Sequence, residues 1–198
     1  MKKTLTYIII AAFLLSFSTA IHAEVPQWKI DPAHTGIYFS IDHIFSKVKG
    51  YFGEFDGRIE FDPDNLEKSG FDFTVKVKSI NTNNSKRDNH LQSDDFFSVK
   101  NYPDIRFKSS SITHNGDNQY SVTGTLNMKD VSREIELPLT FFGTKTHPFD
   151  PKQEVAGFET NITIDRFDYN VGNGKFLKLG VVGKEVDVFV TIEATRNK

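Results

Sequence analysis

The chain has 198 residues, a formal net charge of −2 and no cysteine. This length suits one domain of moderate size, and the near-neutral charge does not favour nucleic acid as a partner. The lack of cysteine excludes a disulfide framework, a cysteine-ligated zinc site and a lipidated N-terminal cysteine, so packing alone must hold the fold.

The first residues predict a secretory signal peptide. Two lysines precede an apolar run over residues 7–15, and small and polar residues follow up to Ala23. The run is about half of the roughly 18 residues that a membrane-spanning helix needs. We expect a signal over residues 1–23, cleavage after Ala23 with Ala20 as the alternative, and one domain over residues 24–198. This predicts a periplasmic protein whose mature chain has no integral membrane segment.

Beyond the signal, the dominant pattern is strict alternation of apolar and polar residues, which is typical of strands with one buried face. The clearest case is residues 71–80, where Phe71, Phe73 and Val75 alternate with polar neighbours. The predicted strands are residues 37–42, 52–61, 71–80, 104–111, 120–128, 133–142, 155–165 and 185–195. Eight such strands predict an all-β antiparallel fold, either a sandwich or a closed barrel.

Two connections interrupt the alternation. Residues 79–103 are polar, and we expect one or two short helices around residues 83–100, with Ser93 as an N-cap and Pro103 closing the segment. Residues 143–154 contain two prolines and are predicted to form an exposed loop.

The sequence offers no catalytic or metal motif. No two histidines after residue 23 are spaced four apart, as in a helical zinc site, and no serine lies in a G-x-S-x-G elbow. Asp94 and Asp95 are adjacent, so on a helix they point apart and form no acid–base pair. We therefore expect a protein that is not an enzyme and that uses no metal and no cofactor.

The glycine-rich residues 172–175 are a weak candidate for an anion-binding loop, because glycines beside a lysine can present backbone donors. Their spacing is not that of a P-loop, and no helix is predicted after them. A tight turn before the last strand is the preferred interpretation.

The polar insertion concentrates cationic groups at Lys86, Arg87 and His90. If the insertion caps an open end of a barrel, Arg87 and His90 are candidates for contact with an anionic lipid head group, Arg87 through its planar guanidinium. The alternative is a solvated helix face with local pairing of Arg87 and Asp88.

Three stretches of the chain resemble the YceI-like family of periplasmic lipid-binding proteins. They are residues 28–62, 79–107 and 122–138. The matching positions are Trp28, Asp31, His34, Phe39, His43, Gly50, Phe52, Phe55, Ser79, Ile80, Thr82, Arg87, Asp88, His90, Leu91, Phe96, Phe97, Tyr102, Pro103, Phe107, Gly124, Leu126 and Val131. Lys129 and Asp130 depart from the pattern, because the family usually has a glycine there; this puts the hairpin turn in question. Arg166 keeps an arginine that the family usually shows.

The resemblance implies a lipocalin-like antiparallel β-barrel whose tunnel holds a long apolar lipid. That lipid would be an isoprenyl diphosphate, an isoprenoid quinone or a similar molecule, bound for sequestration or transport, and a homodimer is one oligomeric state seen in such a family. The inward positions expected to line the tunnel are Ile37, Phe39, Ile41, His43, Phe73, Val75, Val77, Val122, Leu126, Leu137, Leu139, Ile162 and Val188. For His43 the alternative is a hydrogen-bonded residue at the barrel rim, with no ligand contact.

A different function remains open from the sequence. An eight-stranded barrel is just wide enough to be filled by side chains or to hold one small ligand. Of the 19 phenylalanines, only Phe13 and Phe17 lie in the predicted signal, and the others suffice to fill the interior or to wall a tunnel. The alternative is thus a solid-core barrel that acts through its surface, as a periplasmic stress-response or protein-interaction module.

Overall fold

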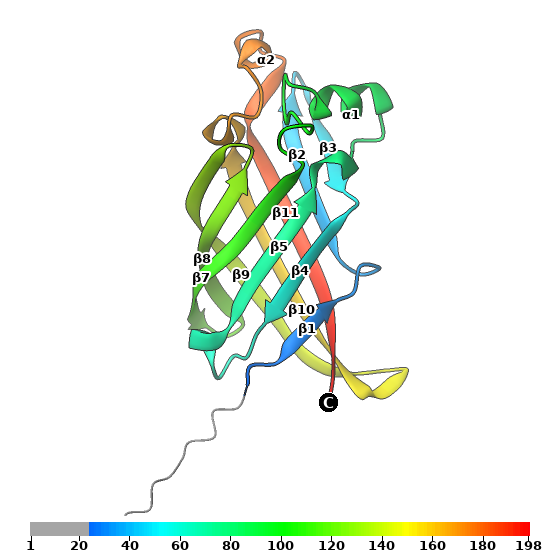
Figure 1. Ribbon diagram of the computed structural model, residues 1–198, viewed down its shortest axis with the longest axis vertical. Coiled ribbons are helices and arrows are strands. Elements are labelled where there is room, and N and C mark those ends of the chain that lie inside the picture. The colour runs from blue at the N-terminus through cyan, green and yellow to red at the C-terminus, as the bar shows by residue number, and fades with distance from the viewer. Residues whose placement is uncertain (1–23) are drawn as a thin grey trace, which may run out of the picture.

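The computed structural model describes residues 24–198; the predicted signal peptide lies outside the described residues. The chain forms one antiparallel sheet that closes into a barrel, with short helices at one end (Figure 1). The elements are β1 (Gln27–Ile30), β2 (Gly36–His43), β3 (Ser46–Phe52), β4 (Phe55–Glu60), η1 (Leu66–Lys68), β5 (Gly70–Lys76), η2 (Val77–Ser79), β6 (Ile80–Asn81), α1 (Ser85–Gln92), β7 (Asp104–Gly116), β8 (Gln119–Met128), β9 (Val131–His147), β10 (Asp150–Asp165), η3 (Arg166–Tyr169), α2 (Lys175–Lys178) and β11 (Val182–Asn197).

Eight strands form the closed ring. Their order is β1-β4-β5-β7-β8-β9-β10-β11, and pairing of β1 with β11 closes it. At one end, β2 pairs with β11, β3 with β2, and β6 with β3, so these three strands extend the wall beyond β1, β4 and β5. The predicted all-β barrel with a short helix in the insertion is therefore confirmed.

All of the predicted strands are present, but several have other ends. The segment 52–61 is divided between β3 and β4, and the segment 71–80 is divided by the 3-10 turn η2. Strand β1 and most of β3 were not predicted. Strand β1 has only four residues, and in β3 small or partly exposed residues, Val48 and Gly50, hold the inner positions, so neither gives a clear alternation.

The predicted exposed loop over residues 143–154 is wrong. β9 continues to His147 and β10 begins at Asp150, so the two strands form a long hairpin with a short turn. Backbone pairing continues there while both faces are largely exposed, which removes the alternation that marks other strands. Pro148 lies in the turn and Pro151 lies where the register shifts, so neither proline breaks the ladder.

The predicted N-cap at Ser93 is also wrong. Helix α1 begins after Asn84, whose side chain accepts a hydrogen bond from the Arg87 backbone N–H at 3.1 Å, and Ser93 is its C-cap. Asn is as good an N-cap as Ser, so residue type alone did not decide between the two positions. The segment after Ser93 is a series of turns that ends at β7.

The turn between β8 and β9 forms without the glycine that the family usually has. Lys129 takes a left-handed backbone conformation, with φ of 55°. Its Nζ donates to the Phe96 carbonyl at 2.8 Å, and the side chain of Asp130 accepts from Asn170 at 3.1 Å. These bonds tie the hairpin to two other segments at this end of the barrel and offset the strain at Lys129.

The opposite end of the barrel has a solid core. Five aromatic rings, here called the aromatic plug, pack with centroid distances from 4.9 to 6.4 Å. They are Phe61, Phe71, Tyr120, Phe141 and Phe158. The indole of Trp28 closes the plug from β1 by donating to the Phe61 carbonyl at 3.0 Å.

Candidate functional site

The other part of the barrel is hollow. An outer cavity of about 280 Å³ lies near α1 and α2, and an inner cavity of about 170 Å³ lies deeper in the barrel. Ile37, Phe52, Ile105, Met128, Ile164 and Val188 line both cavities. The two cavities therefore adjoin at these six side chains, and together they fall in the size range of ordinary small-molecule sites.

The inner cavity ends at the aromatic plug. Phe71, Val122 and Leu139 line it and also belong to the buried cluster that contains the plug. Leu137, Ile162 and Val188 point inward but stay only partly buried, because the empty space leaves their surfaces uncovered. A core filled by side chains therefore occupies only the closed end of the barrel, where the aromatic plug lies.

Most of the predicted tunnel positions line these cavities. Ile37, Phe39, Ile41, His43 and Val188 line the outer cavity. Ile37, Phe73, Val75, Val122, Leu126, Leu137, Leu139, Ile162 and Val188 line the inner one. Val77 lines neither cavity, so its prediction is corrected: β5 ends at Lys76, and Val77 begins the turn η2, where its side chain is fully buried. The alternating pattern was extended past the end of β5, and it therefore placed Val77 in the tunnel wall instead of in a buried turn.

Two of these walls depend on glycine. The ring of Phe39 lies over Gly50, where an added Cβ would come within 2.5 Å of it, and Phe73 lies over Gly57 at 2.8 Å. Each glycine lets a phenylalanine ring pack closely against the backbone of the neighbouring strand. A larger residue would push the ring into the cavity.

Arg166 was not among the predicted site residues, yet it lines the outer cavity with only 5% of its surface exposed. Its Nε donates to the Gly183 carbonyl at 2.9 Å and its Nη1 to the Val171 carbonyl at 2.6 Å. Neither bond uses Nη2. Burial lowers the pKa of Arg166, although the guanidinium stays protonated in proteins. The inward register of Ile162 and Ile164 continues to residue 166, and that signal could have found it.

No carboxylate neutralises Arg166 within the described residues. The neighbouring Asp165 instead pairs with Lys184 at 3.1 Å and accepts from the Phe167 backbone N–H at 3.0 Å. The guanidinium lies over the ring of Phe167 at 4.0 Å. A buried cation held by carbonyls and an aromatic ring favours an anion in the adjacent space.

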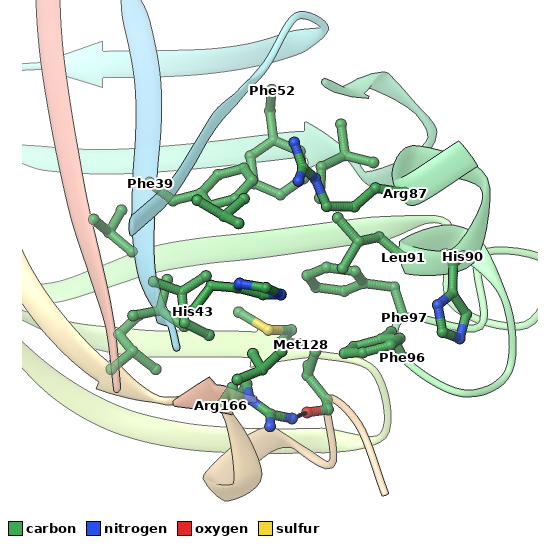
Figure 2. A pocket seen from close by; sticks show the side chains of 18 of the residues that line it. Phe39, His43, Phe52, Arg87, His90, Leu91, Phe96, Phe97, Met128 and Arg166 are labelled. Carbon is green, nitrogen blue, oxygen red and sulfur yellow. Dashed lines mark hydrogen bonds between the residues drawn. The ribbon is translucent and has the colours of Figure 1, made fainter. Parts of the chain in front are cut away.

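Arg87 reaches the outer cavity from α1 (Figure 2). Its Nε donates to Thr82 Oγ1 at 2.7 Å and its Nη2 to the Thr82 carbonyl at 2.8 Å. Asp88 accepts from the Thr82 backbone N–H at 2.9 Å instead of pairing with Arg87. The alternative of local Arg87–Asp88 pairing is therefore wrong, because Thr82 binds each of them separately.

The two histidines of the site differ in position. Figure 2 shows the ring of His43 pointing into the outer cavity, between the walls formed by Phe39 and Met128. His90 lies at the edge, where its ring packs against Phe96 at 5.1 Å and its Nε2 lies 3.0 Å from Asp95. His43 can therefore contact the part of a bound molecule that lies inside the cavity, and His90 can contact the part that lies at the cavity's edge.

Residues 172–175 form a turn, but the expectation that no helix follows is wrong. Gly174 is the N-cap of α2, a single helical turn. Gly172 has φ of +94°, and a Cβ there would lie 2.2 Å from Arg166 Nη1. The glycine thus makes room for the arginine.

The inner cavity has one polar group. Thr160 lines it, and its hydroxyl is buried without a hydrogen-bond partner. All of the other inner lining side chains are apolar.

A separate polar cluster lies outside the barrel. Asp31, His34 and Glu193 place their ligating atoms within 4.8 Å of one another, with His34 Nδ1 2.7 Å from Asp31 Oδ2. The hydrogen bond between them raises the pKa of His34 and lowers that of Asp31. Sequence spacing did not reveal it because Glu193 lies on the last strand.

Comparison with known proteins identifies the family. A family model of the YceI-like domain matches residues 28–194. The chain belongs to the YceI-like family. The UPF0312 protein plu2095 of Photorhabdus laumondii is 34% identical over the full length of both chains. The family resemblance inferred from the sequence is therefore confirmed.

Solved structures agree with the fold. Burkholderia cenocepacia BcnA superposes with a TM-score of 0.76 at 24% identity, over 85% of this chain and 100% of BcnA. A polyisoprenoid binding domain from Saccharophagus degradans, implicated in plant cell wall breakdown, gives a TM-score of 0.64 at 15% identity, over 86% and 98% of the two chains. At these identities the likeness establishes the barrel architecture of the YceI-like chain.

Among the described residues, none of the helices has the length and apolar character needed to cross a bilayer.

Proposed function

We propose that this YceI-like protein binds a long-chain isoprenoid lipid and does not transform it. The observation that carries the proposal is that cationic side chains lie at the outer of two adjoining cavities whose walls are otherwise largely apolar. The inner cavity is apolar apart from Thr160, whereas Arg87, Arg166 and His43 line the outer one. A single-tailed lipid has the same order of polarity, so its tail fits the inner space and its head fits the outer.

The energetics favour long tails. Burial of each five-carbon unit contributes roughly 4 kcal/mol before costs, at about 0.8 kcal/mol per CH₂. Ordering a flexible chain and losing its free motion offset much of this gain. Affinity should therefore rise with chain length until the inner cavity is full.

An anionic head group suits the outer cavity better than a neutral one. Arg166 is buried without a carboxylate partner, and Arg87 lies across the same cavity in Figure 2. A diphosphate would gain charge-assisted hydrogen bonds from both guanidinium groups. An isoprenyl diphosphate is therefore the preferred ligand over an isoprenoid quinone. The polyisoprenoid binding domain with the same barrel supports the isoprenoid class.

A binding assay with a cavity variant tests this function. The Leu137→Glu variant places a charge in the inner cavity and should abolish uptake of a fluorescent polyprenyl diphosphate delivered in micelles. The Thr144→Glu variant puts the same charge on an exposed position of β9 and should bind as the wild type does. The Val188→Trp variant fills the region where the two cavities adjoin with an apolar ring. If this variant folds and takes up less lipid, loss of cavity space and not misfolding is the cause. A folded Leu137→Glu protein with unchanged uptake would contradict the proposal.

We also propose sequestration or transport outside the cytoplasm, after removal of residues 1–23. The lysines and short apolar run of that segment support export. N-terminal mass analysis of the protein from its native envelope should show Glu24 as the first residue. Native mass spectrometry of the same sample should show an unaltered lipid mass; a chemically altered lipid would favour an enzyme. The same spectra show whether the protein forms a homodimer.

A further inference from the structure

Large apolar side chains are exposed around the mouth of the outer cavity. In the turn between β2 and β3, Ile44 is 58% exposed and Phe45 is 101% exposed. In and just after α2, Leu177 is 40% exposed and Leu179 is 64% exposed. The Ile44 backbone N–H donates to the Val181 carbonyl at 3.1 Å, so the two segments lie side by side. We call these four residues the apolar tip.

The same two segments also wall the cavity. Phe176, Val181 and Val182 line the outer cavity from the α2 side, and His43 lines it from the end of β2. Inward side chains thus face the cavity, while their neighbours Leu177 and Leu179 face outward. The apolar tip therefore borders the route by which a lipid would enter.

Lysines without acidic partners surround this tip. Lys175 and Lys178 flank Leu177 and are exposed, and within residues 24–198 neither forms a salt bridge. Lys47 and Lys184 are also near, but Asp42, Asp187 and Asp165 pair with them. In α1, which lies at the same end of the barrel in Figure 1, Lys86 is exposed and likewise unpaired in the described chain. Within the part of the chain that the structure describes, helix α2 therefore carries two unpaired positive charges beside the apolar tip.

We propose that the apolar tip docks on an anionic lipid bilayer, with the mouth of the outer cavity against the membrane. This inference rests on the proposed function. Exposed aromatic and aliphatic side chains with adjacent lysines match the boundary between lipid tails and anionic head groups. A long prenyl chain is strongly disfavoured in water, so a mouth held at the bilayer gives it a path that avoids water.

The other end of the barrel supplies matched controls. Phe149, in the turn between β9 and β10, is 92% exposed, and Lys145 and Lys152 flank that turn. Figure 1 shows this hairpin at the end of the barrel opposite to α2. The aromatic plug closes that end, so docking there would give a lipid no entrance.

Vesicle flotation tests the docking surface. Wild-type protein should bind vesicles of phosphatidylethanolamine and phosphatidylglycerol and bind phosphatidylcholine vesicles much less. The Phe45→Ser/Leu179→Ser double variant should lose about tenfold or more in binding, and the Lys175→Glu/Lys178→Glu double variant should lose a similar factor on anionic vesicles only. The Phe149→Ser and Lys145→Glu/Lys152→Glu variants should bind as the wild type does.

Uptake from micelles separates this inference from the proposed function. The tip residues do not line the cavities, so the tip variants should take up a polyprenyl diphosphate from detergent micelles at the wild-type level. Wild-type protein that ignores anionic vesicles, or tip variants that float as the wild type does, would overturn the docking surface alone. Loss of flotation in the Phe149→Ser variant would overturn it too, by placing the contact at the closed end. Failure of the wild type to load from micelles would overturn the proposed function and leave flotation as a separate finding.

Discussion

The two ends of this barrel share one strand pattern and differ in what fills them. At the closed end, rings from several strands meet across the axis, and Phe61 and Phe158 are almost fully buried. At the open end, the inward residues are mostly Val, Ile and Leu, and Phe39 and Phe73 pack against glycines. Alternation therefore fixes which side chains point inward, whereas the size and tilt of those side chains decide whether the space is filled.

Truncating one phenylalanine at each end should give the largest difference in stability between the two ends. Phe158→Ala opens a cavity in a packed cluster and should lower the free energy of unfolding by about 3–5 kcal/mol. Phe39→Ala removes a ring that already borders empty space and should cost less than half as much. Urea denaturation of both variants measures this difference. Equal losses would mean that the open end is packed as tightly as the plug.

The polar chemistry of the open end is tested by Arg166→Gln. Losing a charge-assisted hydrogen bond of about 1.5–3 kcal/mol should weaken polyprenyl diphosphate binding by roughly tenfold or more. Binding of the uncharged prenol of the same length should change little. Arg106→Gln, at an exposed arginine of β7, is the control. If both ligands lose affinity equally, Arg166 acts through the fold and not through the head group.

Enlarging one residue at each end should also affect the packed and the hollow part of the barrel differently. Ala194→Leu adds volume in the closed end, where Ala194 has no exposed surface, and should cost about 1–3 kcal/mol. Val188→Phe adds volume where the two cavities meet and should cost less than about 1 kcal/mol while reducing lipid uptake. Thermal unfolding and micelle uptake measure the two effects. A Val188→Phe variant as unstable as Ala194→Leu would argue against a hollow interior.

The smallest expected effect lies outside the barrel, at the closed end. Asp31 raises the pKa of His34, so the stabilisation by this histidine is present below about pH 6.5 and is lost as the pH rises through the raised pKa. The lowered pKa of Asp31 gives stability above about pH 4 that is lost on acidification. His34→Gln should therefore lower stability slightly between these values and leave it unchanged at alkaline pH. A constant difference at every pH would point to a packing effect instead.

Much of the fold could be predicted because the alternating residues report directly which face of each strand is buried. The short strand β1 and the ends of β9 and β10 could not, since their pairing depends on backbone bonds to distant strands and not on side-chain pattern. Val77 was misplaced because alternation does not show where β5 gives way to a turn.

The candidate site was predictable in its walls and less so in its polar groups. Most inward positions follow from register, but the depth of the cavities depends on how rings from different strands tilt, which no local pattern encodes. Arg166 continues the register of Ile164 but sits in a 3-10 turn beyond the strand, and its burial depends on the glycine at position 172.

A crystal structure of the protein loaded with a polyprenyl diphosphate tests the hollow end of the barrel most directly. We expect continuous density for the tail from the plug ring Phe71 past Val188, with the diphosphate beside Arg166. Lipid bound only on the outer surface, or an interior closed by side chains with the lipid excluded, would contradict this expectation.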